Sequence, residues 1–306
     1  MTEGFLVVIV GPTAIGKTDV SLELAKALNA EIISADSRQF FKDISIGTAK
    51  PTPFELKSVN HHFVDFLELY QEYSAGQFER DVINFLSSHF QTHSSVVMVG
   101  GSGLYVKAIL DGFDDLPKSP EFRDQLNERF NAHGIKPLVD ELLILDPNVT
   151  VDLENPQRVI RALEVCLGTN KPYSSYLNKS KSKREFTHLV IGLDGPREWV
   201  YDRINQRVDE MLEEGLLEEA ESCLHLKGAH ALKTVGYVEL FEYLEGNCSL
   251  GQATEKIKQH TRNFAKRQWT WFKKRQDIVW MDAREPQAII DYVLSEHHAY
   301  LSKIEG

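Results

Sequence analysis

The chain has 306 residues, 42% of them hydrophobic, which is enough for one large α/β domain or for a domain that carries an insertion. The net charge of −11 argues against a protein that coats nucleic acid with its whole surface, but it does not exclude a local basic face. No apolar run reaches the roughly 18 residues of a membrane span, and the first strand begins too early for a signal peptide, so neither is expected. The 3 cysteines lie far apart without a C-x-x-C pair, which favours a reducing cytoplasm over a disulfide framework or a zinc site.

The first predicted element is a strand over residues 5–10, an apolar run that is typical of a strand buried on both faces of a parallel sheet. The next residues fit G-x-x-x-x-G-K-[ST], and apolar residues at helical spacing follow, which is the context that a phosphate-binding P-loop requires. Its backbone N–H groups and Lys17 would hold a phosphate, and the Thr18 hydroxyl can hold Mg²⁺. The loop consists of Gly11, Pro12, Thr13, Ala14, Ile15, Gly16, Lys17 and Thr18. Most such loops bind ATP or GTP, so a nucleotide is the default ligand here.

A second strand is predicted over residues 31–35, and Asp36 follows it directly. Since ligands bind outside the carboxyl ends of parallel strands, Asp36 is expected on the same edge of the sheet as the P-loop. Its carboxylate would hold Mg²⁺ through water, accept a proton from a nucleophile, or cap the next segment, and the sequence leaves these three roles open. Thr52 with Glu55 predicts the start of a short helix. Residues 61–66 read as another short strand or extended segment.

A buried strand is predicted over residues 95–99, followed by Gly100 and Gly101 and a helix to about residue 110. In an ATP or GTP hydrolase such a strand usually ends in an Asp that helps to hold Mg²⁺. Glycines here indicate either the close approach of a ligand or another backbone, or merely a tight turn.

Residues 111–120 are rich in turn formers, and from there to about residue 184 only helical patterns occur, over 122–130, 136–145 and 157–167. Strands resume over 188–193 and again over 277–281, before a last helix over about 286–301. We therefore predict an α/β fold in which residues 1–115 and 186–306 form a P-loop NTPase-like core, a parallel sheet flanked by helices. Residues 116–185 would form an all-helical inserted domain.

Two helical segments that carry candidate basic side chains follow the insertion. Arg203 and Arg207 share one side of a largely acidic helix, where ion pairs with neighbouring glutamates are expected. Ser249 with Gln252 opens a long helix whose residues 256–275 contain no acid. One face of this helix carries the basic side chains of Lys258, Arg262 and Lys266. The buried side is expected to consist of Ile257, Phe264, Trp271 and Phe272. The basic face predicts contact with phosphates, although most such faces are simply solvated.

Taken together, these segments resemble the bacterial tRNA dimethylallyltransferases, also called tRNA isopentenyltransferases. The resemblance covers nearly the whole chain in family order. It rests on GPTAIGKT at 11–18, ISADSRQ at 33–39, IGTAKP at 46–51, HHFVD at 61–65, YSAGQF at 73–78, VGGSGLYVKA at 99–108, NPQRVIRALEV at 155–165, RINQRVDEML at 203–212, LKTVGY at 232–237 and TRNFAKRQWTWF at 261–272. The family transfers a dimethylallyl group from dimethylallyl diphosphate to N6 of the adenosine 3′-adjacent to the anticodon, in tRNAs that read codons beginning with U. The resemblance thus implies an enzyme that uses Mg²⁺ and acts in the cytoplasm without binding a membrane. We expect this enzyme to be a monomer.

The resemblance also implies roles for single residues. The P-loop would hold the diphosphate of the prenyl donor in place of a nucleotide. Lys17, Thr18 and Arg207 would neutralise the departing pyrophosphate together with Mg²⁺ on Thr18, and Asp36 would take a proton from N6. The tRNA path would include Asp36, Ser37, Arg38, Gln39, Ser102, Arg123, Gln157, Arg158, Val159, Ile160 and Arg161, besides Lys258, Arg262 and Lys266. The sequence departs from the family pattern at Ile15, where Ser is common, at Ser102, where Thr is common, and at Val238, where Arg is frequent.

Two other functions fit parts of the sequence. In a P-loop kinase of a small metabolite, Asp36 would activate a substrate hydroxyl, ATP would occupy the loop and the helical insertion would act as a lid. A nucleotide-dependent RNA-binding module would use the same loop and the basic helix without chemistry. A requirement of pyrophosphate release for tRNA would separate the transferase from both.

Overall fold

The computed structural model describes residues 4–114, 116–177 and 184–305. Its contacts divide the chain into two compact units, Met1–Leu110 with Arg184–Gly306, and Asp111–Lys183. The basic, serine-rich stretch at 178–183 lies outside the described residues. Within the described ranges, no helix combines the length and the hydropathy needed to cross a bilayer.

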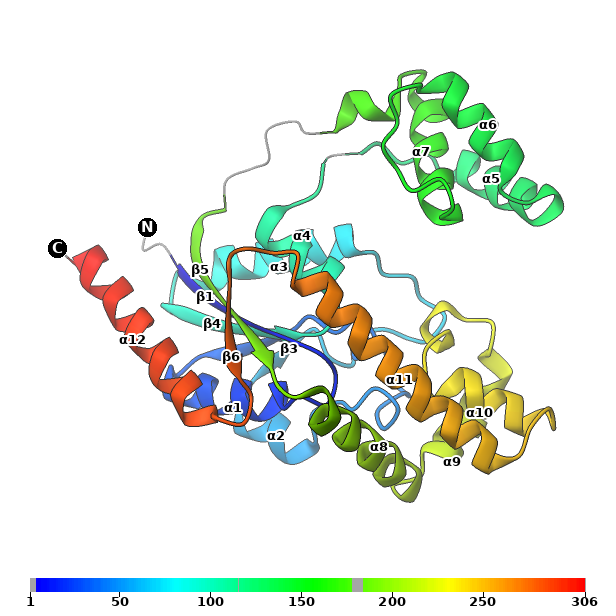
Figure 1. Cartoon of the computed structure of the whole chain (residues 1–306). Coiled ribbons are helices and arrows are strands. Elements are labelled where there is room, and N and C mark those ends of the chain that lie inside the picture. Colours follow the sequence, from blue (N-terminus) through cyan, green and yellow to red (C-terminus); the bar gives the residue numbers. More distant parts are fainter. Residues whose placement is uncertain (1–3, 115, 178–183, 306) are drawn as a thin grey trace. The chain divides into compact units, whose positions relative to one another are not determined.

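The first unit contains a parallel sheet of six strands in the order β3-β2-β4-β1-β5-β6 (Figure 1). The strands are β1 (Gly4–Val10), β2 (Glu31–Ser34), β3 (His61–His62), β4 (Ser95–Gly100), β5 (Phe186–Asp194) and β6 (Ile278–Asp282). Every strand pair is parallel, so the predicted fold class is confirmed. Of the short strand or extended segment expected over 61–66, only the two residues of β3 pair in the sheet, because Phe63 and Asp65 adopt left-handed backbone conformations with φ of 60° and 54°.

Helices cover both faces of this sheet, as Figure 1 shows. They are α1 (Lys17–Ala27), α2 (Pro53–Ser58), α3 (Ala75–His89), α4 (Gly103–Asp111), α8 (Arg197–Glu213), α9 (Leu216–Cys223), α10 (Tyr237–Leu244), α11 (Leu250–Phe272) and α12 (Pro286–Glu305). The two capping boxes predicted from the sequence are present: Thr52 caps α2 with Glu55, and Ser249 caps α11 with Gln252. Local sequence therefore determines where these helices begin.

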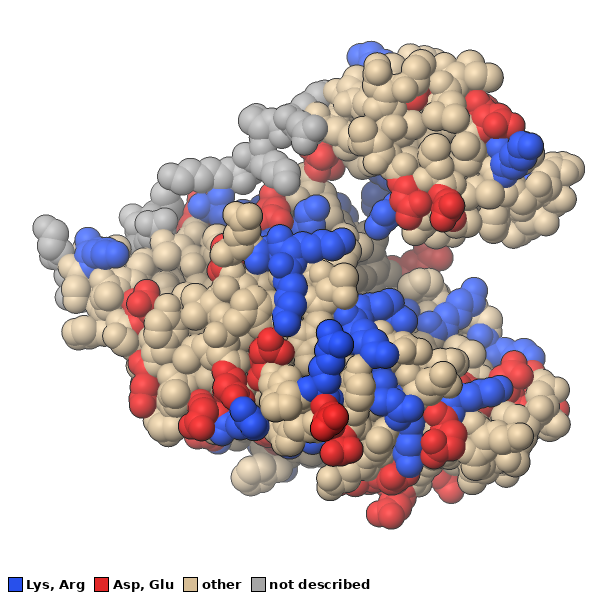
Figure 2. Space-filling view, viewed as in Figure 1, with Lys and Arg blue, Asp and Glu red and all other residues tan. Residues whose placement is uncertain are grey.

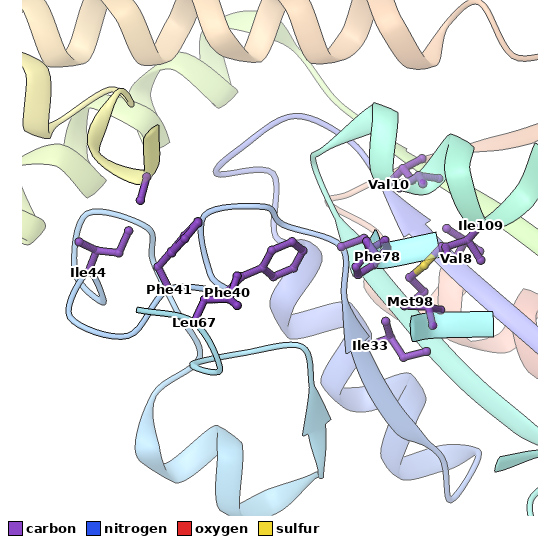
Figure 3. Packing of buried hydrophobic residues seen from close by; sticks show 14 of the residues in the cluster. Val8, Val10, Ile33, Phe40, Phe41, Ile44, Leu67, Phe78, Met98 and Ile109 are labelled. Carbon is purple, nitrogen blue, oxygen red and sulfur yellow. The ribbon is translucent and has the colours of Figure 1, made fainter. Parts of the chain in front are cut away.

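Two apolar layers, one on each face of the sheet, form the core. Val8 and Val10 belong to the layer that contains Phe40 and Phe78 (Figure 3), whereas Val7 and Ile9 belong to the opposite layer. All seven residues of β1 are buried, which confirms the expectation of a strand covered on both faces. Because both faces are filled with side chains, the carboxyl edge of the sheet is left to hold polar loops.

The second unit consists of α5 (Pro120–His133), α6 (Lys136–Leu145) and α7 (Pro156–Thr169) around a small apolar core. Val159 and Ile160 are fully buried in this core, so the prediction that their side chains line a tRNA path is corrected: they pack the helices together. Glu164 is buried as well, and Arg161 and Arg123 approach its carboxylate at 2.7 and 3.4 Å. Gln157 and Arg158 lie on the exposed side of α7.

Candidate active site

A pocket of about 690 Å³ lies within the first unit, where the P-loop and the turns that follow β2 and β4 meet α8, α10 and α11. The P-loop contributes Thr13 and Ala14 to its wall, and the turn after β2 contributes Asp36, Ser37 and Arg38. The P-loop and Asp36 therefore lie at one edge of the sheet, as the sequence predicts. The structure adds that β4 lies between the two strands that carry them.

The P-loop has the backbone geometry that its glycines allow. Gly16 caps α1 with φ of 103°, and a Cβ atom at Gly11 would lie 2.8 Å from the carbonyl oxygen of Leu193. Ile15 is 1% exposed and packs in the apolar layer that includes Leu193, which accounts for an apolar residue at this position. The Lys17 amine donates to the Pro12 carbonyl at 2.7 Å. The loop is therefore shaped for a phosphate while its lysine is held by the backbone.

Positive charge converges on Asp36. Burial lowers the pKa of Lys17 to about 8, although Asp36 opposes this shift, and Arg207 adds to it. Burial likewise lowers the pKa of Arg207, again opposed by Asp36. Two partly desolvated cations beside one carboxylate form a site prepared for an additional anion. Thr18 lies in the first turn of α1, next to Lys17.

The turn after β2 fixes the backbone around Asp36. The Asp36 carboxylate accepts the N–H of Arg38 at 3.0 Å, so its capping role is present, while the other two roles stay open. The Arg38 guanidinium donates to the His230 carbonyl at 2.9 Å. Ser37 donates its N–H to the Ser102 hydroxyl at 3.1 Å, which ties the turns after β2 and β4 together. A hydroxyl at position 102 is enough for this bond, so Ser replaces Thr without loss.

The glycines after β4 make room for α11, which agrees with the close approach considered from the sequence. A Cβ atom at Gly101 would lie 2.1 Å from the Gln268 amide nitrogen, and one at Gly103 would lie 2.1 Å from the Trp271 ring. Gln268 accepts the N–H of Thr13 at 2.8 Å and donates to the Gly101 carbonyl at 3.0 Å. One amide side chain therefore joins the P-loop to the turn after β4, a link that the sequence did not reveal.

The sequence predicts that the arginines of α8 pair with neighbouring glutamates. In the structure their side chains are directed toward the P-loop. The Arg203 guanidinium donates to the Ala14 carbonyl at 2.8 Å and lies 5.1 Å from the centre of the Trp199 ring. Arg207 lines the pocket one helical turn further on. The helix thus supports the loop from the side, and it turns a guanidinium toward the anion site.

The basic side chains of α11 that the sequence singled out turn toward α8. Lys258 forms an ion pair with Asp209 at 2.7 Å, Arg262 donates to Asn205 at 2.5 Å, and Lys266 lies over the Tyr201 ring. We call Lys258, Arg262 and Lys266 the α8-facing side of α11. Figure 2 shows Lys and Arg side chains gathered over the surface along which α11 runs in Figure 1.

A different side of α11 faces the pocket. It carries His260, Phe264, Arg267 and Trp271, at the spacing of a single helical stripe, and we call these the pocket-facing side. Phe264 and Trp271 are 38% and 36% exposed, so the prediction that they belong to the buried side is wrong, because they line a cavity and not the core. Ile257 and Phe272 are buried as expected.

His260 is held by a buried carboxylate. Its Nδ1 atom lies 2.5 Å from the Glu239 carboxylate, which also accepts the N–H of Gly236 at 2.7 Å. Neither residue was singled out from the sequence, because a lone His on a basic helix gives no signal. Among the residues that the structure describes, no group of three or more His, Cys, Asp or Glu side chains is arranged to hold a metal ion.

The sheet, the glycine loop and the pocket at its carboxyl edge define an α/β protein with an anion site of the P-loop type. A family model described as IPP transferase matches residues 39–275. The tRNA dimethylallyltransferase of Christiangramia forsetii is 49% identical over 296 residues, which cover 95% of this chain and 98% of that protein. The tRNA dimethylallyltransferase of Flavobacterium psychrophilum is 47% identical over 95% of this chain and 98% of its own length. The chain belongs to the IPP transferase family.

Solved structures agree with this assignment. The full-length tRNA isopentenylpyrophosphate transferase of Bacillus halodurans matches with a TM-score of 0.73 and 34% identity, over 99% of each chain. A eukaryotic dimethylallyltransferase acting on tRNA matches with a TM-score of 0.80 and 26% identity, over 92% of this chain and 74% of that one. The resemblance deduced from ordered motifs is therefore confirmed.

Proposed function

We propose that the protein transfers the dimethylallyl group of dimethylallyl diphosphate to N6 of the adenosine 3′-adjacent to the anticodon, in tRNAs that read codons beginning with U, and releases pyrophosphate. The observation that carries the proposal is the convergence of Lys17, Arg207 and Asp36 in a chain of the IPP transferase family. The tRNA dimethylallyltransferases among its relatives support this reaction over the kinase alternative.

The P-loop would hold the diphosphate of the prenyl donor. As the bond between the prenyl C1 and the diphosphate oxygen breaks, negative charge grows on the leaving group, and Lys17 and Arg207 would stabilise it, which their positions beside Asp36 support. Mg²⁺ fits here because it commonly uses one or two protein oxygens and completes its shell with substrate phosphates and water. The Thr18 hydroxyl would hold it, and the ion would supply further neutralisation of the diphosphate.

Asp36 would act as the general base. N6 of the adenine attacks C1 of the prenyl group, the C1–O bond breaks, and the N6 proton passes to the Asp36 carboxylate, so that isopentenyladenosine and pyrophosphate result. An aromatic exocyclic amine is a weak nucleophile, so a fixed carboxylate is useful beside it. Asp36 lines the pocket, and its hydrogen bond to Arg38 fixes its orientation.

The rest of the pocket suits an apolar group and an extruded base. Its apolar wall consists of Ile204, Val208, Met211, Leu216, Val235 and Ile257. The five-carbon tail would lie against this wall. The pocket-facing side of α11 offers two exposed aromatic rings with Arg267 between them, which is the composition of surfaces that stack unpaired bases. The target adenosine has to leave its stack to reach Asp36.

The kinase alternative lacks an expected feature. Val99 at the end of β4 is followed by Gly100 and Gly101, whose space is filled by Ala35 and Gln268, and no carboxylate for a metal stands there. We further propose that the protein acts as a monomer in the cytoplasm, where its tRNA substrate is found.

The decisive experiment supplies the protein with Mg²⁺, dimethylallyl diphosphate and unmodified tRNA. Pyrophosphate release that requires the tRNA is expected, whereas ADP formed from ATP without RNA would overturn the proposal in favour of a kinase. Asp36→Asn should abolish transfer while tRNA binding persists. Asp43→Asn, a matched change at an exposed aspartate, should leave the rate unchanged.

A further inference from the structure

We infer that Glu219 is a positioning residue for the transfer reaction, because its carboxylate holds a pocket-lining loop that is connected by hydrogen bonds to the backbone of Asp36. Glu219 lies on α9, outside every motif on which the sequence prediction rested. The inference rests on the proposed function, in which Asp36 accepts the adenine proton.

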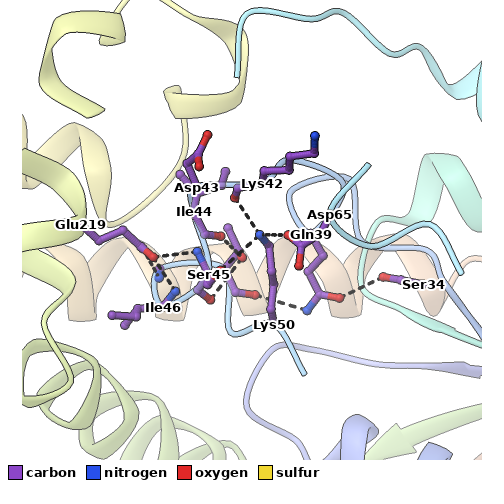
Figure 4. A network of polar contacts seen from close by, with 12 residues as sticks. Ser34, Gln39, Lys42, Asp43, Ile44, Ser45, Ile46, Lys50, Asp65 and Glu219 are labelled. Atoms are coloured by element: carbon purple, nitrogen blue, oxygen red, sulfur yellow. Dashed lines mark hydrogen bonds and ion pairs between the residues drawn. The ribbon is translucent and has the colours of Figure 1, made fainter. Parts of the chain in front are cut away.

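The Glu219 carboxylate accepts four hydrogen bonds. One oxygen accepts the N–H groups of Ser45 and Ile46 at 2.7 and 2.9 Å, as the dashed lines in Figure 4 show. The other accepts the N–H of Gly47 at 2.9 Å and the hydroxyl of Tyr237 at 2.5 Å. Hydrogen bonds to an ionised acceptor are about twice as strong as neutral ones, so this set, which we call the Glu219 clamp, fixes the start of the loop firmly.

Tyr237 makes the clamp rigid. Its side chain is fully buried, and burial together with the nearby Glu219 raises its pKa, so the hydroxyl stays protonated and donates. The loop backbone lies directly against it, since a Cβ atom at Gly47 would lie 2.5 Å from the Tyr237 oxygen. The loop therefore has little freedom to move toward α10.

The far end of the same loop is fastened to the strand that leads to Asp36. The Gln39 amide donates to the carbonyls of Thr48 and Ala49 at 3.3 and 3.0 Å. Gln39 in turn accepts the Ser34 hydroxyl at 2.9 Å (Figure 4). The same hydroxyl accepts the N–H of Asp36 at 3.3 Å. Hydrogen bonds at both ends of the loop thus link α9, through the covalent backbone of the loop, to the N–H of the proposed base.

The loop needs such support. Ala49 has φ of 46°, a left-handed conformation that a residue with a Cβ atom adopts only when its surroundings impose it. Gly47, Thr48 and Ala49 line the pocket together with Asp36. Because a misplacement of about 1 Å can lower a rate by about 10²-fold, releasing the clamp should slow the chemical step.

Glu219→Gln tests the clamp. The amide NH₂ would face backbone N–H groups, so the loop should be released. We expect kcat to fall about tenfold or more, with the KM for dimethylallyl diphosphate unchanged, because the clamp does not contact the P-loop. The amides of Ser45, Ile46 and Gly47 should exchange hydrogen faster. Glu221→Gln, an exposed glutamate on the same helix, is the matched control and should behave as wild type.

Several outcomes decide the matter. Wild-type kcat in Glu219→Gln overturns the inference, and so does a higher KM for the prenyl donor with kcat unchanged. If Glu219→Gln does not fold, Tyr237→Phe decides, since it removes one hydrogen bond and no carbon atoms: kcat should fall about threefold, and an unchanged kcat overturns the inference. If the wild-type protein shows no transfer, the proposed function fails as well; if it transfers and both variants match it, only the role of Glu219 fails.

Discussion

Helix α11 carries basic side chains on two sides, and their surroundings differ. On the α8-facing side, Lys258 and Arg262 already have partners in Asp209 and Asn205. On the pocket-facing side, Arg267 is exposed and lies 5.7 Å from the centre of the Phe264 ring. The comparison teaches that cations grouped on one helix side can already have partners within the protein. We therefore expect RNA to meet the side whose cation is exposed beside aromatic rings.

The largest effect is expected from removing an aromatic ring of the pocket-facing side. Phe264→Ala should weaken tRNA binding by about 5- to 150-fold, because stacking of a base on an aromatic ring contributes about 1–3 kcal/mol. Direct binding measurements at fixed salt would test this. The control is Phe54→Ala, which removes a ring that is 81% exposed on α2 and should have no effect. Equal affinities for both variants would remove Phe264 from the RNA surface.

The next effect concerns the stability of the folded protein and extends the comparison to Lys17, a buried cation whose amine donates to the Pro12 carbonyl beside the pocket residues Asp36 and Arg207. Its pKa of about 8 in the folded protein lies below the usual 10.5, so the folded state disfavours the charged amine. That penalty is complete below pH 8 and disappears as the pH rises from about 8 to 10.5. Lys17→Met should therefore stabilise the ligand-free protein at pH 7, on the order of 1–2 kcal/mol.

Denaturant unfolding at several pH values measures this difference. The advantage of Lys17→Met over wild type should shrink between pH 8 and 10.5, because the wild-type amine loses its proton over that range. The same change at the paired Lys258 should give no such advantage. A stability difference that is independent of pH would contradict the desolvated state of Lys17.

A smaller effect, on the salt dependence of tRNA affinity, should distinguish Arg267 from its neighbour Lys266. Arg267→Gln should flatten the dependence of log affinity for tRNA on log salt by about 0.7–0.9, which is the loss of one phosphate contact. Lys266→Gln, at the next position on the other side of the helix, should leave this slope unchanged. The reverse result would restore the sequence-based prediction for Lys258, Arg262 and Lys266, which is still open.

The smallest effect is expected on the α8-facing side. Lys258→Gln should lower the free energy of unfolding by at most about 1 kcal/mol, because its partner Asp209 is 53% exposed and solvent screens the pair. The affinity for tRNA should change less than twofold. A double-mutant cycle with Asp209→Asn isolates the pair, and a large loss of affinity without loss of stability would assign Lys258 to the RNA instead.

Much of the fold follows from short stretches of sequence. Capping by Thr52 and Ser249, the buried first strand and the glycine loop depend on neighbours within a few residues, so pattern and spacing are sufficient to predict them. The position of β4 between β1 and β2 is not encoded locally, since the strands that pair lie far apart in the chain. The sequence predicts the edge of the sheet at which Asp36 lies, but it does not predict which strands lie beside the strand that carries Asp36.

The site residues show the same limit. Helical spacing correctly groups Phe264 with Trp271, yet an apolar ring that lines a cavity has the same sequence signal as one in a core. The amide of Gln39 bonds to Ser34, Thr48 and Ala49, which the sequence does not predict, and its contact with tRNA stays a prediction. Such contacts depend on segments brought together by the tertiary fold, which spacing alone does not reveal.

The packing of Trp271 on Gly103 has a consequence for how this protein can vary. A methyl group at position 103 would lie 2.1 Å from a rigid indole, so alanine there is tolerated only if the aromatic ring is replaced by something smaller. A change of Gly103 therefore requires a smaller residue at position 271, 168 residues further along the chain, and a library that randomises both positions should recover substitutions of Gly103 only together with a smaller residue at 271.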